Sequence, residues 1–161
     1  MSVAHLTPPV AAPSLHSAMG ALRARGMRVS AARRSILAAL YAVQAPLTAD
    51  ELAGDGDVAS VYRNLDALEA LGLVRHVHAG HGPGRYTIIG ASGEVEFLAC
   101  ERCHTVEVID PARLDGPRAL IERELGLRPR FTHFPLVGLC AGCATAARAP
   151  GSGWPAGRSG G

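Results

Sequence analysis

Hydrophobic residues in the first half of the chain recur every three or four positions, in runs that are separated by short glycine-containing stretches. This spacing predicts four helices, which cover residues 15–25, the run after Ser30, residues 48–54 and residues 58–71. Side chains that can cap a helix precede three of these runs. Ser30 and Asp57 are suitable N-cap residues, and Thr48 with Glu51 has the spacing of a capping box.

The helix predicted at residues 58–71 has one apolar face and one polar face. Its inward stripe consists of Val58, Val61, Leu65 and Leu68. Its outward positions are Ser60, Arg63, Asn64 and Ala67. Because serine, arginine and asparagine side chains can bind phosphate oxygens and base edges, this face is a candidate for contact with nucleic acid.

A β-hairpin is predicted after this helix. Residues 73–78 and 85–89 have the composition of strands, and residues 80–84 between them are rich in glycine and proline. Helices followed by a two-stranded ribbon predict a winged helix-turn-helix, in which the last helix occupies the major groove of DNA. The alternative is a helical module that binds another protein.

The second half of the chain is richer in strand-forming residues. Strands are predicted at residues 95–99, 105–109 and 131–137, and a helix at 117–125 with Leu120, Ile121 and Leu125 facing inward. This α/β unit is small, so we expect zinc and a second subunit to stabilise it. The expected organisation is a flexible arm (1–14), a winged-helix domain (15–90), a dimerisation and metal-binding domain (91–145) and a disordered tail (146–161). The predicted fold class is α+β.

Composition narrows the class of protein. With 48% hydrophobic residues in 161, the chain can form a core, and a net charge of +2 argues against binding to bulk polyanions. We find no apolar run near the roughly 20 residues that span a bilayer and no signal peptide, so we expect a cytoplasmic protein. Five arginines and no acid lie within residues 20–35, which indicates either a solvated helix face or a local basic patch.

Two Cys-x-x-Cys pairs carry the strongest chemical signal. Cys100 and Cys103 form the first pair, Cys140 and Cys143 the second, and 36 residues separate the pairs. Four thiolates on two tight turns suit one tetrahedral structural zinc. The alternatives are two redox-active pairs or four buried thiols.

Several motifs follow one another in a specific order. They are Gly26-Met27-Arg28-Val29-Ser30 with Arg33, then Leu47-Thr48-Ala49 with Glu51-Leu52, then Ser60-Val61-Tyr62-Arg63, then Gly72-Leu73-Val74, then Arg85-Tyr86 and the two cysteine pairs. Over about residues 15–144 this order resembles the ferric uptake regulator family of metal-responsive repressors, and we favour its zinc-uptake-regulator-like branch. The resemblance implies a homodimer that closes onto a palindromic DNA operator when metal binds at the hinge between its domains.

The resemblance also implies roles for individual residues. Tyr62 and Arg63 match the pair that contacts bases, and Arg28 and Arg33 match arginines near the phosphates. With the outward Ser60 and Asn64, these residues form the predicted DNA-binding set. The four cysteines match the structural zinc ligands of the zinc-containing members.

One departure from the family concerns the sensory metal site. Relatives carry a histidine cluster just before the first cysteine pair, whereas this chain has Glu94, Val95, Glu96 and Phe97 there. Substitute ligands for a second, regulatory ion are His76, His78, His81, Glu94, Glu96, Glu107 and His133. His76 and His78 are two positions apart on a predicted strand, so both rings project from one face.

The identity of the regulatory metal stays open at this point. Imidazole and carboxylate ligands suit zinc, nickel, iron or manganese, and the nitrogen-rich set favours zinc over nickel and iron. Two histidines in the linker with a third near the last strand also resemble the nickel-responsive branch, which does not rest on four cysteines. His104, where relatives have glycine, is predicted to be a turn residue.

These observations predict a zinc-responsive repressor of metal-homeostasis genes. A nickel- or iron-responsive regulator is the first alternative, and a zinc-stapled redox or peroxide sensor is the second. We expect no enzyme activity and no small-molecule substrate, because four cysteines leave zinc without an open coordination position and we find no nucleophile–base arrangement.

Overall fold

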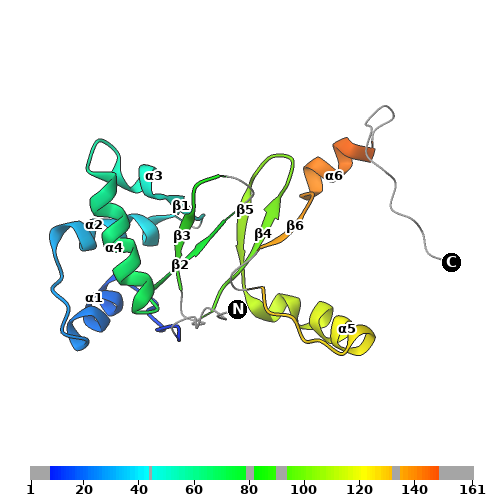
Figure 1. Ribbon diagram of the computed structural model, residues 1–161, viewed down its shortest axis with the longest axis horizontal. Coiled ribbons are helices and arrows are strands. Elements are labelled where there is room, and N and C mark those ends of the chain that lie inside the picture. Colours follow the sequence, from blue (N-terminus) through cyan, green and yellow to red (C-terminus); the bar gives the residue numbers. More distant parts are fainter. Residues whose placement is uncertain (1–7, 44, 79–81, 90–93, 132–134, 149–161) are drawn as a thin grey trace.

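The computed structural model describes residues 8–43, 45–78, 82–89, 94–131 and 135–148. Four helices and a small sheet form the first half, and a second sheet with two further helices forms the second half (Figure 1). The predicted α+β class is confirmed. None of the helices in the described ranges is both long and apolar enough to span a bilayer.

The four predicted helices of the first half are present. They are α1 (Leu15–Ala24), α2 (Ala31–Ala42), α3 (Ala49–Ala53) and α4 (Val58–Ala70). The predicted caps form: the Ser30 hydroxyl accepts from the Arg33 N–H, and Asp57 accepts from the Ala59 N–H. Thr48 and Glu51 make both bonds of the capping box. Local hydrogen bonding therefore sets where these helices begin.

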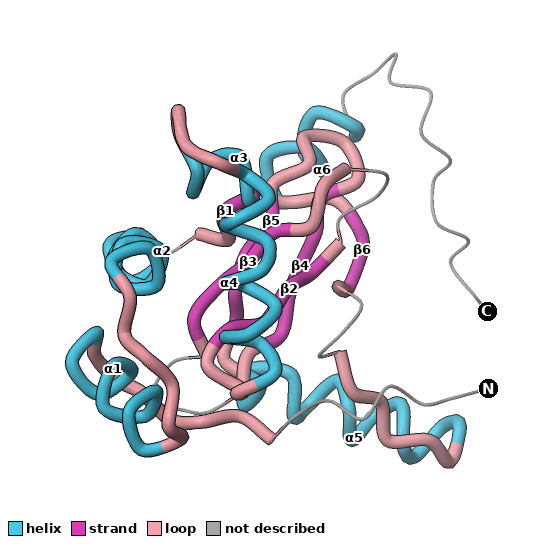
Figure 2. Tube along the Cα trace, turned by 60° about the vertical axis from the view of Figure 1, so that its left-hand side comes forward, coloured by secondary structure: helices cyan, strands magenta, loops and turns pink. Residues whose placement is uncertain are grey.

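The first sheet has the order β1–β3–β2. Strands β2 (Val74–Val77) and β3 (Arg85–Ile88) form the predicted antiparallel hairpin, and the short β1 (Leu47–Thr48) adds to the other edge of β3. In Figure 2, α4 crosses in front of this sheet. A helical unit that ends in a three-stranded sheet is the winged arrangement expected from the sequence.

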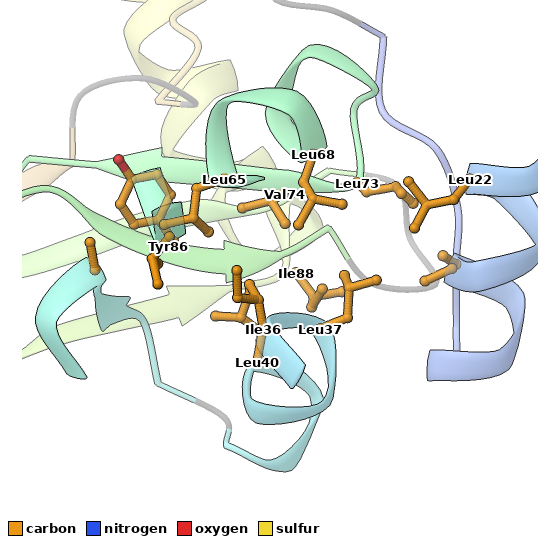
Figure 3. Packing of buried hydrophobic residues seen from close by; sticks show 14 residues of the cluster. Leu22, Ile36, Leu37, Leu40, Leu65, Leu68, Leu73, Val74, Tyr86 and Ile88 are labelled. Carbon is orange, nitrogen blue, oxygen red and sulfur yellow. The ribbon is translucent and has the colours of Figure 1, made fainter. Parts of the chain in front are cut away.

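One apolar core holds the first half together. Leu65 and Leu68 of α4 pack with Leu37 of α2 and Leu22 of α1, over Val74 of the sheet (Figure 3). Each of these five side chains is fully buried. The predicted inward stripe of α4 is thus confirmed at its buried positions, which fixes the face that α4 presents to solvent.

Residues 8–13 differ from the flexible arm expected there. The Val10 N–H donates to the Gly72 carbonyl at 2.8 Å, and the Tyr41 hydroxyl donates to the Ala12 carbonyl at 2.6 Å. Ala12 is fully buried in the core. Small and apolar side chains let this segment pack closely over the end of α4, so that part of the arm prediction is wrong.

The second sheet has the order β5–β4–β6. Strand β4 (Glu96–Cys100) pairs antiparallel with β5 (Val106–Ile109) and parallel with β6 (Leu136–Gly138). The strand predicted at residues 131–137 is observed as the shorter β6, and Phe131 lies outside it. Pro135 has no N–H to donate, which is consistent with the late start of β6.

Helix α5 (Asp115–Leu125) follows a 3₁₀ turn at Pro111–Leu114 and begins two residues before the predicted start. Pro117 fits within its first turn, where no intrahelical donor is needed. The expectation that Leu120 and Leu125 face inward is wrong for the single chain, since they are 50% and 74% exposed. Helix α6 (Ala141–Arg148) was not predicted.

Candidate metal centre and nucleic-acid interface

The four cysteines converge at one end of the second sheet. Cys100 is the last residue of β4, and Cys103 lies in the turn that follows. Cys140 immediately precedes α6, and Cys143 lies in the first turn of that helix. Their sulfur atoms all lie within 4.8 Å of one another. The turn after β4 and the first turn of α6 therefore bring together thiols that are 36 residues apart in sequence.

Backbone hydrogen bonds shape both cysteine turns. The His104 N–H donates to the Cys100 carbonyl at 2.9 Å, and the Ala144 N–H donates to the Cys140 carbonyl at 2.8 Å. His104 has a φ of 58°, in the left-handed region that favours glycine, so its assignment as a turn residue is confirmed. The Cys140 N–H points at the Cys100 sulfur, 3.4 Å away.

These donors stabilise thiolates. Backbone N–H groups of Cys103 and Cys140 lower the pKa of Cys100 to about 6. A hydrogen bond from the Thr105 hydroxyl lowers the pKa of Cys103 as well. By contrast, a hydrogen bond with the Cys140 sulfur, together with burial, raises the pKa of Cys143 to about 12, because both favour the neutral thiol. A divalent cation would instead stabilise the thiolate form.

The donor set fits zinc. Soft sulfur ligands clustered at this separation suit the tetrahedral geometry of a four-cysteine site, and two of the sulfurs, in Cys103 and Cys140, are 3.8 Å apart. Such a site has no position for a substrate. Cys100, Cys103, Cys140 and Cys143 would hold the ion, which would join β4 to α6 as a structural staple.

Helix α4 presents the predicted nucleic-acid-binding residues. Tyr62 is 37% exposed, and the Arg63 side chain is 70% exposed and lies 3.5 Å from the Asp57 carboxylate. An ion pair this exposed contributes little energy, so Arg63 is available to a phosphate or a base. Asn64 donates from its amide to the Ser60 carbonyl at 2.8 Å, which fixes its orientation along the helix.

The two arginines expected near phosphates lie before and within α2. Arg28 is exposed, and its carbonyl accepts from the Arg33 guanidinium at 2.8 Å. The Arg33 Nε atom is buried, and nothing in the described part of the chain accepts a hydrogen bond from it. The hydrogen bond to the Arg28 carbonyl holds the Arg33 guanidinium close to the start of α2.

Two of the candidate sensory ligands lie together on the first sheet. The rings of His76 and His78 are 5.2 Å apart and edge to face, as expected for side chains on one face of β2. The Nδ1 atom of His76 is 2.7 Å from a carboxylate oxygen of Glu69 in α4. That hydrogen bond raises the pKa of His76 against the opposing effect of burial. His81 and His133 lie outside the described residues.

The candidate carboxylates are dispersed. Glu94 lies 3.3 Å from Arg130, Glu107 is exposed on β5, and the buried Glu96 pairs with Arg118 of α5 and accepts from the Phe131 N–H at 3.3 Å. Both Glu96 oxygens are engaged, which disagrees with a sensory role for this residue. Within the described ranges, the four cysteines are the only group of three or more potential metal ligands that converge.

Sequence reasoning missed two residues of these ion pairs, Glu69 and Arg118. Glu69 is one of two acids on α4, and Arg118 is one of two arginines on α5. The partner of Glu69 is His76 in β2, and the partner of Arg118 is Glu96 in β4, so each contact joins two different elements. Only the positions of the elements in space identify them, because no local spacing distinguishes them from solvent-exposed neighbours.

Comparison with known proteins agrees with this geometry. A family model described as the ferric uptake regulator family matches residues 24–133. The peroxide operon regulator of Bacillus subtilis strain 168 is 27% identical over 141 residues, which cover 83% of this chain and 96% of the relative.

Solved structures show the same fold. The ferric uptake regulator of Helicobacter pylori, reported with three functional metal-binding sites, matches with a TM-score of 0.64 and 17% identity, over 81% of this chain and 94% of that chain. A zinc uptake regulator complexed with zinc and DNA matches with a TM-score of 0.52 and 20% identity, over 82% and 93%. The chain therefore belongs to the ferric uptake regulator family and is a metal-dependent transcriptional regulator.

Proposed function

We propose that this protein is a zinc-dependent repressor that binds a palindromic DNA operator as a homodimer and controls metal-homeostasis genes. The observation that carries the proposal is α4, which buries Val61, Leu65 and Leu68 and leaves Tyr62 and Arg63 exposed. A helix of this kind beside a winged sheet fits the major groove. The zinc uptake regulator solved with zinc and DNA has the same fold.

A second copy of the chain fits the surface of the second half. Leu120, Leu125, Leu127 and Val137 are each at least 50% exposed, and strand β5 is an edge of its sheet. Exposed apolar side chains together with an open strand edge favour association. Two copies related by a two-fold axis would present two α4 helices, which accounts for a palindromic operator.

The zinc that supports this activity is assigned to the four cysteines. A second, regulatory ion would draw on His76, His78, His81, Glu94, Glu107 and His133, with zinc first and nickel or iron as alternatives. Counting metal per chain after treatment with a mild chelator decides this point. One retained zinc supports the cysteine site alone, and a second, chelator-sensitive equivalent supports a regulatory site.

The proposed DNA binding is tested with the zinc-loaded protein and a library of randomised DNA duplexes. We expect selection to enrich a palindrome, and Arg63→Ala to weaken binding to it by roughly tenfold, since one arginine contact to a base is worth about 1–3 kcal/mol. Arg123→Ala is the matched control, because Arg123 is equally exposed, at 70%, but lies on α5. No enriched sequence, or equal affinities for the two variants, would refute this role for α4.

A peroxide-responsive regulator is the second candidate function. It is favoured by the similarity to the peroxide operon regulator and by the exposure of Cys103. Dilute hydrogen peroxide would then oxidise thiolates, release zinc and release DNA in parallel. Retention of zinc and DNA under peroxide would exclude this candidate.

A further inference from the structure

His76 of β2 is held by a carboxylate of α4, the helix proposed to contact DNA. Its Nδ1–H donates to both oxygens of Glu69, at 2.7 and 2.8 Å, and its backbone N–H donates to Glu69 Oε1 at 3.1 Å. Glu69 lies in the last turn of α4. Both side chains are only 26% exposed, so water screens the pair only in part. The backbone bond anchors the carboxylate, and the anchored carboxylate fixes the orientation of the ring.

This contact also determines which ring nitrogen of His76 can bind an ion. An ionised carboxylate can only accept hydrogen bonds, so Nδ1 carries the proton, and in the neutral ring the lone pair lies on Nε2. Histidines that bind metal ions usually donate their other N–H to a carboxylate or a carbonyl, which orients the ring and makes it a better ligand. Glu69 and His76 have the arrangement of a supporting carboxylate and its ligand.

His78 supplies a second imidazole on the same face of β2. The two ring centres are 5.2 Å apart, with the ring planes at 80°. Two imidazoles bound to one tetrahedral zinc have ring centres roughly 5 Å apart. A Cβ atom on Gly84 would lie 3.3 Å from Cε1 of His78, so that ring rests against the backbone of the hairpin. Both rings are thus positioned by their neighbours, at a separation that suits one ion.

The face of β2 that carries these rings is the face that α4 covers. Side chains alternate along a strand, so His76 and His78 point to the same side as Val74, which is fully buried in the core that includes Leu68 of α4. An ion bound by His76 would therefore be separated from α4 by one imidazole ring and one hydrogen bond to Glu69.

We propose that Glu69 is a positioning residue for the regulatory ion: it orients His76 as a ligand, beside His78, and links occupancy of that site to α4. This inference rests on the proposed function, which supplies the regulatory ion and the DNA-contacting role of α4. The ion is a divalent cation that imidazole nitrogen suits, such as zinc or nickel. When it binds, the ring loses electron density, the Nδ1–H becomes a stronger donor, and its bond to Glu69 strengthens. The last turn of α4 is then held more firmly against β2.

The first measurement is the affinity for a second equivalent of zinc, in the full-length protein that already holds one zinc per chain. Competition with a chromophoric chelator at neutral pH gives the dissociation constant. We expect Glu69→Gln to weaken binding by about 10–100-fold, the usual effect of losing the carboxylate behind a histidine ligand. Asp66→Asn is the matched control, because it removes the same charge from an exposed position on the same helix. It should stay within about twofold of the wild type, since solvent and salt screen an exposed charge.

Hydrogen exchange of α4 separates this positioning role from a purely structural ion pair. In the wild type, we expect the second zinc to slow exchange of the amides of residues 66–70 by about threefold or more. In Glu69→Gln, saturation with zinc should leave their exchange unchanged. A purely structural pair would instead alter protection of α4 equally with one zinc and with two, and would leave the affinity for the second zinc at its wild-type value.

Each outcome bears on the proposal separately. Wild-type zinc affinity in Glu69→Gln, or equal protection of α4 by the second zinc in that variant, would overturn the role of Glu69 and leave the regulatory ion in place. A wild type that binds no second equivalent of zinc, nickel or iron(II) would refute both. If Glu69→Gln does not fold, Glu69→Asp should weaken the second zinc by a smaller factor, and unchanged affinity there would count against the role. Failure to select a DNA sequence would refute the proposed DNA binding but leave these measurements valid.

Discussion

At the scale of single residues, Gly72 shows how the N-terminal segment constrains the chain. Its φ is +73°, and a Cβ atom there would lie 2.2 Å from the carbonyl oxygen of Pro8. Gly72→Ala combines a left-handed alanine with a clash against backbone. We expect a loss of well over 1 kcal/mol in the free energy of unfolding, measured by urea denaturation.

Gly26→Ala is the control for this prediction. Gly26 has nearly the same φ, +72°, but nothing lies within 4 Å of its Cβ position. It should lose only about 1 kcal/mol, the cost of left-handed alanine alone. Equal losses of unfolding free energy for the two variants would show that residues 8–9 do not pack against Gly72 in solution.

The buried ion pair of Glu96 and Arg118 supports a second residue-scale prediction. The two side chains are 3% and 8% exposed, so removal of either one leaves a buried charge unpaired. Glu96→Ala should destabilise the zinc-loaded protein by roughly 3 kcal/mol in chemical denaturation. Glu124→Ala removes an exposed partner of Arg123 and should change stability by less than about 1 kcal/mol. Similar losses in both variants would contradict the buried role of Glu96.

Residue chemistry was predictable where it depended on local spacing. The four cysteines and the caps at Ser30 and Thr48 follow from neighbours a few positions apart, and the structure has them as expected. Glu96 was expected to serve a metal because its contact with Arg118, 22 positions away, leaves no sign in the sequence.

At the scale of elements, the contact between α4 and β2 depends on pH. Glu69 hydrogen-bonds His76 and raises its pKa, so this contribution to stability is complete below about pH 6.5 and is lost as the pH rises through the raised value. Burial raises the pKa of Glu69, but the hydrogen bond and charge of His76 outweigh it and lower the net value. Its contribution is lost as the pH falls through that lowered value.

We therefore expect Glu69→Gln to cost roughly 1 kcal/mol of unfolding free energy at pH 6 and less as the pH rises through the raised pKa of His76. Urea denaturation at pH 6 and at a series of higher pH values measures this change. Glu122→Gln is the control, because its partner at 3.1 Å is Arg128, which stays charged throughout. A cost for Glu69→Gln that does not change with pH would mean that His76 stays neutral in the folded protein.

Elements with strong local signals were predicted better than those that depend on partners. The helices of the first half begin at their capping residues, as expected. Strand β6 is shorter than predicted because its extent is set by pairing with β4. Helix α6 was missed because half of its eight residues are alanine and it has no stripe of large apolar side chains. Exposed Leu120 and Leu125 show that an apolar pattern identifies a face but not what covers it.

At the scale of the whole molecule, the two halves differ in how much apolar core they contain. The first half has a core of its own drawn from four helices and a sheet, whereas the second half has a small cluster around Phe97 and the four cysteines, which we propose to be joined by zinc. The packing of Val77 of β2 in that cluster could not be predicted, because β2 alone does not show which core its last residue joins.

This difference predicts the effect of losing one zinc ligand. Binding of zinc at a structural site contributes on the order of 10 kcal/mol, as much as the entire stability of an ordinary domain. Cys103→Ser should therefore lose stoichiometric zinc and expose the amides of β4–β6 to hydrogen exchange, while α1–α4 keep their protection. Arg102→Ser changes the adjacent exposed residue of the same turn to the same amino acid and keeps all four thiols. It should retain one zinc per chain and normal protection, and a fully protected Cys103→Ser variant would mean that the second half folds without its metal.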